Sequence, residues 1–258
     1  MLLAIDTGNT NTVFAVFDDD GRILGEWRSS TNINRTADEV GVWLGQLMAL
    51  AGIERRAIKA VIISSVVPAT LFSLRLLSRR YFACQAQVVG APDVKLGIDV
   101  LVERPEEVGA DRLVNAVGAH LEYGGPMIII DFGTATTFDV IDENGAYLGG
   151  VIAPGVNLSL EALHTASAQL PRVAIGRPER VIGKNTVQAM RSGIFWGYIG
   201  LIEGMITRIR AEYGATLDVI ATGGLAPLFT ECTNAISRTD PDLTLKGLLA
   251  VHRLNVKP

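Results

Sequence analysis

The chain has 258 residues, of which 48% are hydrophobic and 19% are charged, and its formal net charge is −4. This length and composition predict a globular protein with a sizeable core in one large or two small domains. The charge balance, without any long basic cluster, excludes nucleic acid as the main partner, because neutralising phosphates needs a concentrated basic surface. The two cysteines, Cys84 and Cys232, match no metal or redox spacing, which predicts a reducing, cytoplasmic location.

The first residues predict a β-hairpin whose turn carries polar chemistry. An apolar run over 2–5 ends in Asp6, a cluster of small hydroxyl and amide side chains follows through Thr12, and alternation resumes over 13–17. Gly8 lets the backbone approach a ligand closely, and the Thr and Asn side chains can donate hydrogen bonds to phosphate oxygens. Asp6, at the strand end, is suited to hold a hydrated cation. An ordinary Asn/Gly-rich turn is the alternative interpretation.

The following segments alternate between helical and strand patterns. Three antiparallel strands followed by alternating helices and strands predict a mixed sheet covered by helices. Pro92, Gly97 and Pro105 predict a connector over residues 92–105. The elements expected before the connector are a third strand over 22–29, a helix over 37–51, a strand over 60–67, a helix over 69–81 and a short strand over 87–89.

A second segment repeats the pattern of the first hairpin. The apolar strand 127–130 ends in Asp131, so that Asp131 aligns with Asp6, Gly133 with Gly8 and Thr134 with Asn9. Strands over 138–141 and 147–152 follow, separated by an acidic turn that ends at a glycine, as in the first copy. We interpret the repeat as an internal duplication that produces two similar lobes, residues 1–105 and 106–258. Two such lobes would place their turns face to face across a cleft that holds a triphosphate.

A short polar segment lies between the two turns. Gly109 precedes a predicted helix whose apolar face includes Leu113 and Val117, and Asp111 and Arg112 lie near the start of that helix. An aspartate there can accept a proton from a substrate hydroxyl, and the arginine can pair with a carboxylate or a developing phosphoryl charge. A surface charge pair that caps the helix is the alternative.

Two further segments bear on partners. The apolar stretch from Gly193 to Ile202 is too short to span a bilayer and predicts a buried helix, so no membrane partner is expected. Gly223 and Gly224 are typical of a turn, and the alternative is that they make room for adenosine.

The paired turns resemble the phosphate loops of the acetate-kinase, sugar-kinase, heat-shock ATPase and actin superfamily. Six motifs in order resemble the type III pantothenate kinase family from residue 1 to about residue 250: Asp6-Thr-Gly-Asn-Thr10, Gly109-Ala-Asp-Arg112, Asp131-Phe-Gly-Thr-Ala-Thr-Thr137, Gly149-Gly-Val-Ile-Ala-Pro-Gly155, Lys184-Asn-Thr186 and Thr222-Gly-Gly224. The resemblance implies an α/β fold of duplicated actin-like ATPase (ribonuclease H-like) domains, with mixed sheets, helices packed on them and ATP in the cleft between the lobes.

The resemblance also implies an activity, ATP-dependent phosphorylation of the 4′-hydroxyl of pantothenate, the first step of coenzyme A biosynthesis. Asp111 would be the general base, Asp131 would bind a monovalent cation, K⁺ or NH₄⁺, and Asp6 is a candidate for holding the Mg²⁺ of ATP through water. The family is homodimeric, and the helix over 186–209 is a candidate interface. The implied ATP contacts are Asp6, Thr7, Gly8, Asn9, Thr10, Asn11, Thr12, Val13 and Thr134, and the implied substrate contacts are Gly109, Ala110, Asp111, Arg112 and Thr186.

Two other functions fit parts of the sequence. A non-catalytic nucleotide-binding regulator of the same family is the first, but such a protein has no need of a base, so the joint presence of Asp6, Asp111 and Asp131 favours catalysis. A phosphate-ester hydrolase on the same fold is the second, and it would not need the Gly109–Arg112 segment. The stretch 100–104 lacks the aromatic residue that some family members carry before this segment, so the apolar wall of the substrate pocket is not assigned.

Overall fold

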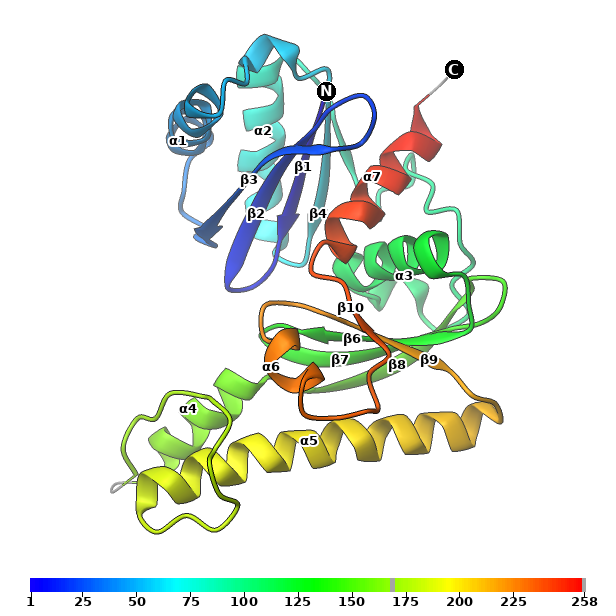
Figure 1. Cartoon of the computed structure of the whole chain (residues 1–258). Coiled ribbons are helices and arrows are strands. Elements are labelled where there is room, and N and C mark those ends of the chain that lie inside the picture. The colour runs from blue at the N-terminus through cyan, green and yellow to red at the C-terminus, as the bar shows by residue number, and fades with distance from the viewer. Residues whose placement is uncertain (168–169, 257–258) are drawn as a thin grey trace. The chain divides into compact units, whose positions relative to one another are not determined.

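The computed structural model describes residues 1–167 and 170–256, and the chain forms two compact units (Figure 1). The N-terminal unit combines Met1–Tyr123 with Asp242–Pro258, and the central unit is Gly124–Pro241. Each unit contains a five-stranded sheet of mixed direction with helices packed on it, as predicted from the sequence. The N-terminal unit extends past the predicted boundary between residues 105 and 106, because the helix Ala110–Tyr123 packs on the N-terminal sheet, and the last helix of the chain joins the same unit.

The N-terminal sheet has the strand order β3-β2-β1-β4-β5. Strand β1 pairs with β2 in the antiparallel direction and with β4 in the parallel direction, and its residues Leu3 and Ile5 are fully buried under α1 and α2. Leu2 and Ala4 point to the opposite face, which α3 and α7 cover. The elements are β1 (Leu2–Thr7), β2 (Asn11–Phe17), β3 (Ile23–Ser30), α1 (Ala37–Leu50), η1 (Arg55–Ala57), β4 (Ala60–Ser65), η2 (Pro68–Thr70), α2 (Leu71–Phe82), β5 (Ala86–Val88), η3 (Pro105–Glu107), α3 (Ala110–Tyr123) and α7 (Leu243–Asn255).

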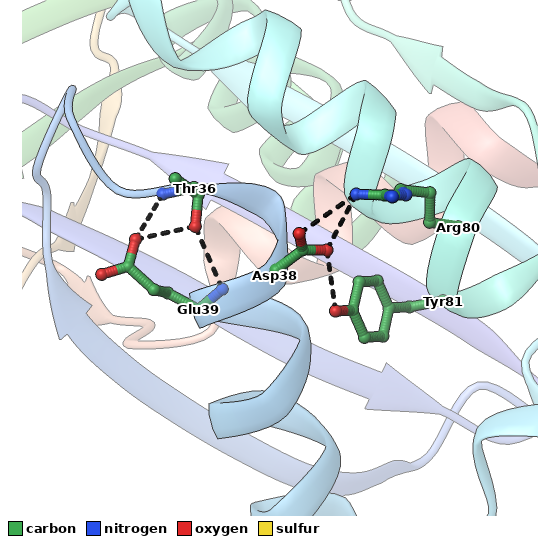
Figure 2. A network of polar contacts seen from close by, with 5 residues as sticks. All are labelled: Thr36, Asp38, Glu39, Arg80 and Tyr81. Atoms are coloured by element: carbon green, nitrogen blue, oxygen red, sulfur yellow. Dashed lines mark hydrogen bonds and ion pairs between the residues drawn. The ribbon is translucent and has the colours of Figure 1, made fainter.

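Polar contacts fix the start of α1 and join it to α2 (Figure 2). Thr36 and Glu39 form a capping box, in which each side chain bonds the backbone N–H of the other residue. The Asp38 carboxylate accepts hydrogen bonds from Arg80 Nη1 at 3.0 Å and from the Tyr81 hydroxyl at 2.9 Å. These contacts join the start of α1 to the end of α2, the two helices that cover one face of the sheet.

The backbones of helices α3 and α7 lie in direct contact, with no side chain between them at the closest points. A Cβ atom on Gly247 would lie 2.0 Å from the carbonyl oxygen of Val114, and one on Gly118 would lie 2.7 Å from the carbonyl oxygen of Leu243. Only glycine at these positions permits the approach. Val114 packs with Leu248 against the strands of the N-terminal sheet, which explains why α3 and α7 both belong to this unit.

The central sheet repeats the design of the first, with the order β10-β9-β6-β7-β8. Strand β6 pairs with β7 in the antiparallel direction and with β9 in the parallel direction, as β1 pairs with β2 and β4. This correspondence agrees with the predicted internal duplication. The elements are β6 (Met127–Phe132), β7 (Ala135–Ile141), β8 (Tyr147–Pro154), α4 (Val156–Ala166), α5 (Thr186–Tyr213), β9 (Asp218–Thr222), α6 (Ala226–Thr230) and β10 (Arg238–Thr239).

Helix α5 lies along one face of the central sheet (Figure 1). Its residues Phe195 and Ile202 are fully buried against Ile128 and Ile130 of β6, as the apolar stretch of the sequence predicts. In the described part of the chain, no helix combines the length and the apolar character that crossing a bilayer requires.

Candidate functional site

The turn between β1 and β2 contains the polar residues predicted to contact phosphates. The N–H of Gly8 donates to the carbonyl oxygen of Asn11 at 3.0 Å, which closes the turn. The residues at its tip, Asn9, Thr10 and Asn11, are exposed, whereas Thr7 and Thr12, which face each other across the hairpin, are buried. The tip is therefore the part of the turn that a phosphate can reach. Val13 follows in β2 and is half-buried.

Asp6 lies near the end of β1 and is half-buried. Because side chains alternate along a strand, Asp6 points to the same sheet face as Leu2 and Ala4, the face covered by α3 and α7. Its parallel neighbour in β4 is Ser64, whose buried hydroxyl has no hydrogen-bond partner among the described residues. The predicted cation ligand thus lies beside a buried hydroxyl oxygen, that of Ser64, which makes no hydrogen bond within the described part of the chain.

The Gly109–Arg112 segment forms the start of α3 in the same unit as the first turn. Asp111 Oδ1 accepts a hydrogen bond from the backbone N–H of Arg112 at 2.8 Å. A Cβ atom on Gly109 would lie 2.6 Å from that carboxylate oxygen and 3.5 Å from Val66 Cγ1, so the glycine leaves room for the carboxylate. Ala110 is the first residue of α3, and the positive end of the helix dipole favours the negatively charged form of Asp111 in the first turn. The structure therefore places Asp6 and Asp111 on the same side of one sheet.

The second turn, between β6 and β7, is built like the first. The N–H of Gly133 donates to the carbonyl oxygen of Ala135 at 3.0 Å, and Thr134 at the tip is exposed. The N–H of Gly155 donates to the carbonyl oxygen of Thr134 at 3.0 Å, and a Cβ atom on Gly155 would lie 2.2 Å from the same oxygen. The glycine at the end of the predicted Gly149–Gly155 motif therefore supports this turn directly.

Asp131, at the end of β6, lies against the glycine pair that follows β9. A Cβ atom on Gly223 would lie 2.7 Å from both Asp131 Oδ1 and the carbonyl oxygen of Phe132, and Gly223 has a φ of +90°. A carboxylate and a carbonyl oxygen therefore converge at a position that only glycine leaves open. Oxygen donors of this kind suit a hard cation such as K⁺. A Cβ atom on Gly224, by contrast, would meet nothing within 4 Å.

No cluster of three or more His, Cys, Asp or Glu side chains that could hold a metal occurs among residues 1–167 and 170–256. The predicted roles, Mg²⁺ brought with ATP and a monovalent cation at Asp131, need only single carboxylates.

Thr186 is the first residue of α5 and is exposed. The preceding Asn185 caps the helix, because its side-chain oxygen accepts a hydrogen bond from the N–H of Gln188 at 2.9 Å. The N–H of Lys184 donates to Gln188 Oε1 at 2.8 Å. The Lys184–Thr186 motif therefore starts the long helix and leaves the Thr186 side chain accessible.

Sequence reasoning missed a buried carboxylate on the Asp131 face of the central sheet. Asp139 accepts hydrogen bonds from the Tyr147 hydroxyl at 2.7 Å and from the Thr137 hydroxyl at 3.0 Å. Thr137 pairs with Asp131 across the β6–β7 ladder. The available signal is a charged residue between two apolar residues, Phe138 and Val140, in a predicted strand.

Residues 2–208 match the sequence profile of a family described as type III pantothenate kinase. The chain belongs to the type III pantothenate kinase family. A type III pantothenate kinase of Rhodospirillum rubrum is 69% identical over 255 residues, which cover 99% of each chain. A type III pantothenate kinase of Paramagnetospirillum magneticum is 64% identical over 258 residues, which cover 100% of this chain and 99% of the other. These matches confirm the family that the six motifs predict. They also show that this member of the type III pantothenate kinase family is a kinase.

Solved structures of distant proteins share the fold. The activator of the 2-hydroxyisocaproyl-CoA dehydratase from Clostridium difficile, solved with bound ADPNP, has a TM-score of 0.56 at 12% identity and covers 100% of this chain and 98% of its own. The ROK hexokinase from Thermus thermophilus has a TM-score of 0.50 at 13% identity and covers 98% of each chain. At these identities the similarity concerns the fold alone. It confirms the predicted fold class, an α/β fold of two duplicated units with mixed sheets.

Proposed function

We propose that the protein transfers the γ-phosphoryl group of ATP to the 4′-hydroxyl of pantothenate, the first step of coenzyme A biosynthesis. The observation that carries the proposal is near full-length identity of 69% to a type III pantothenate kinase. The three carboxylates that the resemblance assigns to chemistry, Asp6, Asp111 and Asp131, are all present at strand ends or at a helix start. A non-catalytic regulator would not require the base among them.

The proposed ATP site uses the residues Asp6–Val13 together with Thr134. The exposed tip of the first turn presents the side chains of Asn9 and Asn11 as donors to phosphate oxygens. The nucleotide analogue bound to the dehydratase activator supports nucleotide binding by a protein of this fold. Mg²⁺ that arrives with ATP neutralises phosphate charge, and Asp6 is the residue proposed to hold it through water.

The proposed substrate site lies at the start of α3. Asp111 accepts the proton of the pantothenate hydroxyl as the phosphoryl group transfers, and Arg112 pairs with the pantothenate carboxylate. Phosphoryl transfer requires mainly positioning and charge neutralisation, so one base and one cationic partner suffice on the acceptor side. Gly109, Ala110 and the exposed Thr186 complete the proposed contacts to substrate.

The proposed monovalent cation site is Asp131, with K⁺ or NH₄⁺ as the ion. Its support is the convergence of Asp131 Oδ1 and the carbonyl oxygen of Phe132 beside Gly223. A bound cation there supplies positive charge next to the second turn, whose exposed Thr134 is proposed to contact phosphate.

The decisive test is a coupled kinase assay with purified protein, ATP, Mg²⁺ and pantothenate, with KCl or NH₄Cl compared with NaCl. We expect turnover of pantothenate that K⁺ or NH₄⁺ stimulates. Phosphorylation of another hydroxylated acid but not of pantothenate would contradict the proposed substrate. Nucleotide binding without turnover of any acceptor would instead favour the regulatory alternative. A cytoplasmic location stays a prediction.

We also propose that the protein is a homodimer that pairs through α5. Gly193, Gly197 and Gly200 are exposed along one face of this helix, and Cβ atoms on them would meet nothing within 4 Å. Small residues at such spacing let a second helix approach closely. Sedimentation equilibrium should give a dimer mass for the wild type and a monomer mass for Gly197→Glu, with circular dichroism to show that the variant is folded. A wild-type monomer would contradict the proposal.

A further inference from the structure

We propose that Thr31, just after β3, is a positioning residue that holds the first phosphate turn in its binding conformation. Its hydroxyl donates to the carbonyl oxygen of Gly8 at 2.7 Å, and its backbone N–H donates to the carbonyl oxygen of Thr10 at 2.9 Å. The hydroxyls of Thr31 and Thr12 are 3.0 Å apart. Thr31 thus contacts the turn at three residues, although it lies outside every motif that the sequence singles out.

The hydrogen atoms can be assigned from these contacts. A hydroxyl has one proton to donate, and Thr31 uses its proton on the carbonyl oxygen of Gly8. The bond between the two hydroxyls therefore uses the proton of Thr12. In this arrangement the buried Thr12 hydroxyl donates to Thr31 and so acts as part of the support of the turn. The donor side chains left at the tip include those of Asn9 and Asn11, which are exposed.

Comparison with the second turn, between β6 and β7, separates the contacts that both turns share from those that Thr31 adds at the first turn. Gly155, which follows the third strand of the central sheet as Thr31 follows β3, donates its N–H to the carbonyl oxygen of Thr134. The backbone bond is therefore common to the two duplicated units. Gly155 has no side chain, and a Cβ atom there would lie 2.2 Å from the same carbonyl oxygen. Gly155 therefore cannot supply the side-chain clamp that Thr31 supplies at the first turn, which is the turn proposed to carry most of the ATP contacts.

A turn held in this way loses less conformational freedom when a phosphate binds, so affinity is gained without a further contact to the ligand. Thr31 does not itself need to touch ATP. Removing its hydroxyl should leave the backbone bond to Thr10 in place and free the carbonyl of Gly8 and the side chain of Thr12 to move. The loss should appear in nucleotide binding and not in the binding of pantothenate.

The inference rests on the proposed function, and its test is a comparison of Thr31→Val with Thr31→Ser. We expect Thr31→Val to raise the KM for ATP and the Kd for ADP by about tenfold, since the loss of one or two internal hydrogen bonds corresponds to about 1.4 kcal/mol. The KM for pantothenate should stay within about twofold, and Thr31→Ser, which keeps the hydroxyl, should restore values near those of the wild type.

Ser78→Ala is the matched control, because it removes a hydroxyl-to-carbonyl bond of 2.8 Å to Cys84 in the same unit but away from the turn. Equal nucleotide affinity in folded Thr31→Val and the wild type would overturn the inference, as would an equal loss in Ser78→Ala. If Thr31→Val does not fold, Thr31→Ala replaces it. A wild type that binds ADP but does not phosphorylate pantothenate would refute the proposed function alone, because the ADP titration still decides the role of Thr31.

Discussion

Asp111→Asn is expected to lower kcat for pantothenate phosphorylation by about a thousandfold, within the range that a general base contributes. The amide has the same shape as the carboxylate, and its oxygen can still accept the hydrogen bond from the N–H of Arg112. It also fits beside Gly109, where a carboxylate oxygen already approaches closely. What the variant loses is the ability to accept the proton of the substrate hydroxyl. Steady-state assays at saturating ATP and pantothenate measure this loss.

Two controls separate loss of the base from loss of the fold or of the nucleotide site. Glu106→Gln, an exposed neutralisation in η3 just before the same segment, should leave kcat unchanged. Calorimetric titration with ADP should give the same Kd for Asp111→Asn as for the wild type, because Asp111 is not among the proposed ATP contacts. Turnover close to that of the wild type in Asp111→Asn would show that another group takes the proton.

Gly223→Ala is expected to weaken activation by K⁺ strongly. The new methyl group would lie 2.7 Å from Asp131 Oδ1 and from the carbonyl oxygen of Phe132, so the carboxylate must move. A displacement of about 1 Å in a catalytic site can cost about a hundredfold in rate. We expect activity at saturating KCl to fall by about ten- to a hundredfold and the half-saturating KCl concentration to rise. Both quantities come from rate measurements over a KCl series.

Gly224→Ala is the matched control, since its Cβ atom would enter open space. The φ of +90° at Gly223 adds backbone strain of about 1–2 kcal/mol for alanine, so thermal unfolding must show that Gly223→Ala is folded at the assay temperature. A KCl activation curve identical to that of the wild type would show that Asp131 does not bind the cation. Equal losses in the two variants would point instead to a role of the glycine pair as a whole.

The sequence by itself determined the two hairpins and most of the elements around them. Buried apolar strands such as 2–5 and 127–130 and amphipathic helices such as 37–51 depend on local periodicity, which can be read without knowing what packs against it. The resemblance of the six motifs to one family, which the matches confirm, also came from the order of short local patterns.

Other features were decided only by the tertiary structure, because they depend on residues far apart in the chain. The N-terminal unit includes α7 because Gly247 lets that helix approach α3 more closely than any side chain allows. Gly223 lies against Asp131 because β9 pairs with β6 in parallel. Thr31 reaches Gly8 across the hairpin. Local patterns do not predict these contacts, even where a motif includes one of the residues, since each contact joins segments that come together only when the sheets form.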